Sequence, residues 1–111
     1  MNIPEHRKAI DKFDTQIVKL LNERTKHVLA IGEMKRKGGE EIYAPHRERA
    51  VLQRICRKNQ GPITNPSLRA IYREIMSSAL SLEKTLTVAY LGPEATFTHQ
   101  AAIRRFGASL R

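Results

Sequence analysis

The sequence has little of what would indicate a disulfide-stabilised, membrane-spanning or β-rich protein. Cys56 is the single cysteine among 111 residues, so no internal disulfide framework is available and a reducing, cytoplasmic location is expected. Aromatic residues make up only 5% against 41% hydrophobic residues, which favours a helical bundle over a β-sandwich. No stretch approaches the ~20 consecutive apolar residues of a membrane span, and the first residues lack the apolar run of a secretion signal. We therefore expect one small helical domain, with the rest of the chain lying outside it.

Acidic residues are also scarce relative to basic ones. The 20 Lys and Arg residues against 11 Asp and Glu residues give a formal charge of +9, which implies an anionic partner. The alternative hypothesis is a basic helical dimer that acts as a nucleic-acid-binding or dimerisation/regulatory module, and DNA binding that falls steeply with salt would support the nucleic-acid role. The sequence has no helix-turn-helix motif and no base-stacking aromatic cluster, so we expect that the protein does not bind nucleic acid. In the alternative, the contacts would come from surface cations: Lys8, Lys12, Lys19, Lys26, Arg36 and Lys37.

Proline and glycine are absent after Pro4 as far as Lys37, except for Gly32. Pro4 is favourable in a first helical turn and Gly38-Gly39 is a strong stop, so the pattern predicts one helix ~50 Å long. Such a helix is longer than the body of a domain of this size and needs a partner along its length. Its apolar residues recur at seven-residue spacing in two columns typical of a helix-packing seam: Ile3, Ile10, Ile17 and Ile31, and then Phe13, Leu20 and Met34.

Three cations lie on this apolar stripe or at its edge: Arg7, Arg24 and Lys35. A cation aimed at a helix interface needs an anion to meet it, although a single one can snorkel to solvent instead. Arg24 and Lys35 are eleven residues apart, close to three turns, so both can converge on one small molecule. Arg7 is ~25 Å further along the axis, so it can join them only from an antiparallel copy of the helix. This geometry predicts a homodimer with two equivalent, shared sites.

Two shorter helices are predicted next. One begins at Pro45 and ends before Asn59-Gln60-Gly61-Pro62, and the other opens with Asn65 as N-cap and Pro66 in its first turn. For the helix that opens at Asn65, the helical spacing of apolar residues predicts which ones face inward: Leu68, Ile71, Tyr72, Ile75, Met76, Ala79, Leu80 and Leu82.

The pattern changes after Lys84. Thr87 to Leu91 is β-prone, Gly92-Pro93-Glu94 is a turn, and Thr96 to Phe106 is helical in pattern. A strand, a tight turn and a helix are typical of the start of an α/β domain, but about 25 residues cannot bury a sheet. The expected architecture is an all-α, intertwined helical homodimer with a C-terminal remnant of an α/β domain.

Residues 5 to 85 resemble the all-helical chorismate mutase family. The similarity is carried by Arg7, Ile10, Asp14, Leu20-Leu21, Glu23-Arg24, Ile31-Gly32, Lys35 and Pro45-His46-Arg47-Glu48-Arg49. The segment from Val88 to Ala102 looks like the opening of a prephenate dehydratase domain. This order resembles the bifunctional enzymes of phenylalanine biosynthesis, which implies a mutase domain at 1–86 and a truncated dehydratase start at 87–111, without dehydratase activity.

The resemblance implies a reaction that suits the cations. Chorismate, a dianion, rearranges within itself to prephenate, so the protein supplies a compressed conformer and positive charge at the ether oxygen, with no cofactor or metal. By resemblance, Lys35 donates to the ether oxygen and to one carboxylate, while Arg24 and the second chain's Arg7 hold the carboxylates. Arg47 adds positive potential and Glu48 holds the substrate hydroxyl. His6, His27 and His46 have no metal-ligand spacing and are expected at the surface or an interface.

Glu83 matches the family position at the end of the last helix, where a Gln or Glu side chain also reaches the ether oxygen. An ionised carboxylate only accepts hydrogen bonds, so this role requires a protonated Glu83. The other reading is that Glu83 only pairs with Lys84 or solvent. The sequence departs from the family pattern at two positions: Ala44 stands where an acidic residue is frequent, and Ala79 where a Ser is common. These departures bear on the rate of the reaction and not on its type.

Overall fold

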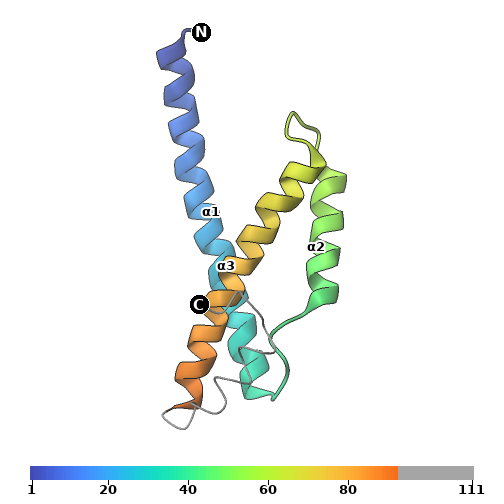
Figure 1. The fold of residues 1–111 in the computed structure, drawn as a ribbon. Coiled ribbons are helices and arrows are strands. Elements are labelled where there is room, and N and C mark those ends of the chain that lie inside the picture. The colour runs from blue at the N-terminus through green and yellow to red at the C-terminus, as the bar shows by residue number, and fades with distance from the viewer. Residues whose placement is uncertain (93–111) are drawn as a thin grey trace.

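The protein is described by a computed structural model over residues 1–92, and this part of the chain is built from three helices (Figure 1). They are α1 (Ile3–Lys37), α2 (Pro45–Lys58) and α3 (Asn65–Leu91). The predicted all-α fold with one long and two shorter helices is confirmed for residues 1–92, where no strand occurs.

Side chains at the helix starts satisfy backbone N–H groups that lack a partner within the helix. Asn2 caps α1, its Oδ1 accepting from the Glu5 amide at 2.9 Å. Thr64 caps α3, its hydroxyl accepting from the Ser67 amide at 3.4 Å. The predicted cap at Asn65 is therefore wrong by one position. Asn65 is the first helical residue, and its Oδ1 accepts instead from Asn59 Nδ2 at 2.7 Å.

The strand predicted from Thr87 to Leu91 is wrong, because α3 continues through Leu91. The β-branched residues there disfavour a helix only weakly, and contacts with α1 outweigh that preference. Thr87 donates to the Glu83 carbonyl at 2.8 Å within the helix and accepts from Arg36 of α1 at 3.4 Å. The helix ends at Gly92, whose φ of 81° suits glycine. The predicted domain boundary at 86/87 falls inside α3, and the turn and helix predicted beyond Gly92 lie outside the described residues.

The helices are arranged so that α3 contacts both of the others. Figure 1 shows α2 and α3 as a helical hairpin, with α3 crossing the C-terminal half of α1. The buried apolar residues of the described part are few, namely Val51, Ile55 and Ala79, so one chain alone builds a small core. Ile71 and Leu82, predicted to face inward, are 48% and 43% exposed.

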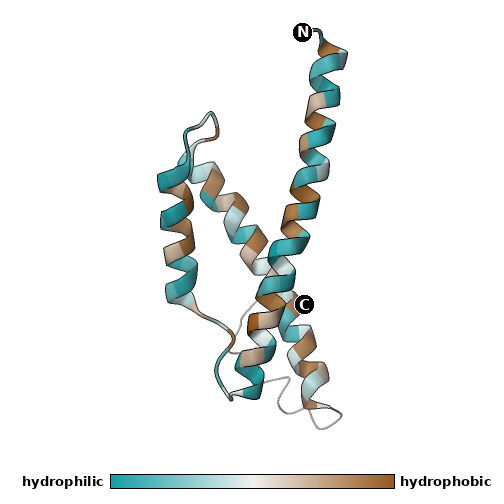
Figure 2. Cartoon of the chain, turned by 180° about the vertical axis from the view of Figure 1, so that it is seen from behind, coloured by the Kyte–Doolittle hydropathy of each residue, from teal (hydrophilic) through white to brown (hydrophobic). Residues whose placement is uncertain are grey.

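The N-terminal half of α1 extends away from the other two helices, and its apolar stripe is uncovered (Figures 1 and 2). Every residue from 10 to 20 is exposed. The exposed fractions of the stripe lie between 52% and 66% for Ile3, Ile10, Phe13, Ile17 and Leu20. Helices gain most of their stability from tertiary packing of such a face, and residues 1–92 of one chain do not provide it. None of the helices within this range has the length and apolar character to cross a membrane.

Gly32, the one buried residue of α1, allows α3 to approach closely. A Cβ placed there would overlap the carboxyl group of Glu83, which is itself buried. An alanine at this position would thus require the Glu83 carboxyl group to move.

We predict that Gly32→Ala lowers the free energy of unfolding by about 1–3 kcal/mol, because the overlap forces the Glu83 carboxyl away from its partners. Gly38→Ala is the matched control: its new Cβ meets the Met34 carbonyl at an ordinary 3.5 Å, and its φ of −86° suits alanine. Urea unfolding of both variants makes the comparison. Equal or greater stability of Gly32→Ala than of the control would contradict the close approach.

Candidate active site

A pocket of about 350 Å³ lies between the C-terminal half of α1, the start of α2 and the middle of α3. This volume falls in the range of small-molecule sites. Five of the six predicted site residues line it, and the structure thus brings them together from three helices: Arg24, Lys35, Arg47, Glu48 and Glu83. Arg7 is not among the lining residues and lies on the exposed N-terminal half of α1.

The cations of α1 share a face, as their spacing predicts. Arg24 and Lys35 are both half-buried and both line the pocket. Arg47 and Glu48 come from the first turn of α2, which Pro45 begins and in which the Glu48 amide donates to the Ala44 carbonyl at 3.1 Å. The pocket therefore combines three cations with two carboxyl groups, an arrangement suited to an anion that also carries a hydroxyl.

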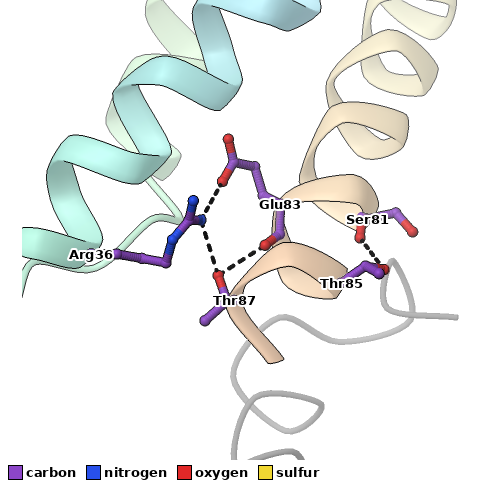
Figure 3. Close-up of polar contacts among 5 residues, drawn as sticks. All are labelled: Arg36, Ser81, Glu83, Thr85 and Thr87. Carbon is purple, nitrogen blue, oxygen red and sulfur yellow. Dashed lines mark hydrogen bonds and ion pairs between the residues drawn. The ribbon is translucent and has the colours of Figure 1, made fainter. Parts of the chain in front are cut away.

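Glu83 of α3 is the buried acid of the site, with 1% of its surface exposed. Its Oε2 accepts from Arg36 Nη1 at 3.1 Å, and the Arg36 side chain is 11% exposed (Figure 3). Its Oε1 is buried and has no hydrogen-bond partner among residues 1–92. Glu83, which lines the pocket, therefore has one carboxyl oxygen fixed by a cation and one that has no partner within residues 1–92.

Burial raises the pKa of the Glu83 carboxyl above its ordinary value. The charge and hydrogen bond of Arg36, and then the charge of Lys35, lower the pKa but do not cancel the effect of burial. The protonated fraction of Glu83 at a given pH is thus larger than for an exposed glutamate. This is the form that can donate a hydrogen bond.

Sequence reasoning missed several residues of the site. Arg36 was grouped with the surface cations, because nothing in Lys35-Arg36-Lys37 distinguishes a buried cation from exposed ones. His27, expected at the surface or an interface, is exposed and also borders the pocket, and Gly32 lines it as well. The remaining wall is mostly apolar, from Val28, Ile31, Ile42, Tyr43, Val51, Met76, Ala79 and Leu80. No group of three His, Cys, Asp or Glu residues that could hold a metal occurs in the described range.

Comparisons with known proteins identify the family of this chain. Residues 6–84 match the family described as chorismate mutase type II. A bifunctional chorismate mutase/prephenate dehydratase from Neisseria gonorrhoeae is 53% identical over 102 residues, which is 92% of this chain and 28% of that protein. One from Aquifex aeolicus is 50% identical over 111 residues, covering 96% and 31%. The chain thus spans about 30% of the length of these curated relatives.

A solved structure shows the same fold. Form II of chorismate mutase from Thermus thermophilus superposes with a TM-score of 0.72 at 33% identity, covering 74% of this chain and 93% of that one. The predicted family and enzyme class are confirmed by these matches. The chain belongs to the chorismate mutase type II family.

Proposed function

We propose that the chain rearranges chorismate to prephenate, in phenylalanine biosynthesis, within the pocket between α1, α2 and α3. The observation that carries this proposal is the convergence of Arg24, Lys35 and Arg47 on one pocket of about 350 Å³. Chorismate is a small dianion, and its two carboxylates match this concentration of positive charge.

The reaction breaks an ether C–O bond while a C–C bond forms within the same molecule, so no protein nucleophile is required. Catalysis then consists of holding a chair-like conformer and stabilising the negative charge that develops on the ether oxygen. Lys35 donates to that oxygen and to one carboxylate, while Arg24 holds a carboxylate. Arg47 adds positive potential, and Glu48 accepts from the substrate hydroxyl. The apolar wall excludes water and strengthens these interactions.

Lys35→Ala tests the proposal directly. Loss of one such donor removes roughly 2.7–4 kcal/mol of transition-state stabilisation, so kcat should fall by about a hundredfold or more. Lys37→Ala is the control, because Lys37 is two residues away, 69% exposed and paired only with Glu33 at the surface in the described part. The rate is followed as the loss of chorismate absorbance. Wild-type protein that leaves chorismate unchanged, or equal rates for both variants, would contradict the assignment.

The proposal includes a homodimer in which Arg7 of the partner subunit completes each site. It is supported by the uncovered apolar stripe of α1, since a second antiparallel α1 would bury it. It is also supported by the distance of ~25 Å along α1 between Arg7 and Arg24, which prevents both from reaching one ligand within a chain.

Mixing inactive variants tests the shared site. Arg7→Ala and Arg24→Ala should each be inactive, but chains unfolded and refolded together should regain roughly a quarter of wild-type activity. The reason is that about half of the random dimers are mixed, and each mixed dimer holds one intact and one doubly altered site. Native mass spectrometry confirms the heterodimers. Heterodimers without activity would show that Arg7 and Arg24 do not combine across subunits.

Glu83 is proposed to donate a hydrogen bond to the ether oxygen in its protonated form. Activity should therefore rise as pH falls, since protonation increases as pH drops through a pKa that burial has raised. Glu83→Gln always carries N–H donors, so its rate should be flat or higher near neutrality. The measurement is kcat/KM from roughly pH 5 to 8. A wild-type profile that is flat over this range would exclude the role.

A further inference from the structure

The end of α1 and the last turns of α3 are joined by a polar network centred on Arg36. Its Nη1 donates to Glu83 Oε2 at 3.1 Å and to the Thr87 hydroxyl at 3.4 Å. The guanidinium also lies over the ring of Tyr90, 5.9 Å from its centroid. Figure 3 shows Arg36 reaching from α1 toward Glu83 and Thr87 on neighbouring turns of α3.

This network makes the two oxygens of the Glu83 carboxyl different. Oε2 accepts from a permanent cation, so a proton on that oxygen would face the N–H donors of Arg36. Oε1 is buried and has no hydrogen-bond partner within residues 1–92. A proton on Glu83 is therefore placed on Oε1, and Figure 3 shows the two oxygens pointing in different directions.

Other charged groups line the same pocket or adjoin Glu83 along the chain. They come from α1, from α2 and from the next position of α3: Arg24, Lys35, Arg47, Glu48 and Lys84. Arg36 differs from these in that its hydrogen bond to the Glu83 carboxyl determines the orientation of that group. The charge of Lys35 acts on the same carboxyl as a smaller influence.

We propose that Arg36 is a positioning residue of the mutase site, which holds Glu83 by Oε2 and leaves Oε1 as the oxygen that carries the proton, in a residue that lines the pocket. Through Thr87 and Tyr90, the same guanidinium ties this orientation to the last turns of α3. The inference rests on the proposed role of Glu83 in the mutase reaction. Arg36 itself does not line the pocket, so it acts through Glu83 and not by contact with substrate.

Arg36→Met tests this assignment, because Met keeps a long unbranched side chain but removes the charge and the donors. We expect kcat/KM at the acidic plateau to fall by about tenfold or more, the effect of losing a charged hydrogen bond that orients a reacting group. The descending limb of the pH profile should also move to higher pH, since removing the cation lets the pKa of Glu83 rise. Lys37→Met is the matched control, with the same change in charge in the same helical turn at an exposed position.

Two further variants separate positioning from a purely structural role. In a Glu83→Gln background the amide has no pH-dependent proton, so Arg36→Met should lower the rate without shifting the pH profile. Arg36→Lys keeps the charge but not the planar fork that reaches both Glu83 and Thr87, so the plateau should fall several-fold while the pH limb stays in place. An Arg36→Met protein that is merely less stable, with the wild-type plateau and pH limb, would overturn the proposal. An Arg36→Lys plateau equal to wild type would do the same.

A measurement without substrate distinguishes this inference from the proposed function. The carboxyl carbon of Glu83 is followed by NMR against pH in the wild type, Arg36→Met and Lys37→Met. A higher pKa of Glu83 in Arg36→Met only would support the contact between Arg36 and Glu83. This result would stand even if the protein did not consume chorismate, in which case the mutase proposal alone would fail. If the wild-type protein is active but the pKa of Glu83 is the same in the wild type, Arg36→Met and Lys37→Met, the role of Arg36 is overturned and the mutase proposal stands.

Discussion

The structure depends on the burial of one carboxyl group, that of Glu83, in the contact between α1 and α3. Burying an ionised group without a partner is very unfavourable, so its neighbours must compensate. Arg36 provides a cation and a hydrogen bond, and Gly32 provides the space that any other residue would fill. Because the two lie one turn apart on α1, one face of that helix both receives the carboxyl and neutralises it. The same face carries Lys35 into the pocket, so fold stability and site electrostatics use the same contact.

Burial and charge act on this carboxyl in opposite directions. Desolvation favours its neutral form, whereas Arg36 and Lys35 favour the ionised form. The pKa of Glu83 is raised on balance, because burial has a larger effect than the two cations. An amide at this position would avoid the conflict, since it donates at any pH and needs no desolvation to do so. In the proposed mechanism, a glutamate therefore makes the activity depend on how well the α1–α3 contact excludes water.

The sequence predicted the helices and most of the candidate site because both follow from periodicity. Arg24 and Lys35 converge because eleven residues are close to three turns, and Gly38-Gly39 ends α1 where expected. Arg36 was not recognised, because burial of one cation in a basic run depends on how α3 crosses α1. The strand predicted from Thr87 failed for a related reason: local β preference of a few tenths of a kcal/mol per residue is weaker than continued helix packing on α1. Long-range contacts decided both cases, and no local pattern encodes them.

The two halves of α1 have different relations to the rest of the described chain. The C-terminal half packs on α3 and forms the pocket wall, whereas the N-terminal half carries exposed apolar residues and Arg7. An apolar stripe of this length without cover would promote association in any case. Because Arg7 lies on this uncovered half, the surface that would associate in the proposed dimer is also the one that would deliver Arg7 to the partner's site. Assembly and completion of the site would then be a single event, and a chain that failed to associate would bind the substrate dianion with one cation fewer.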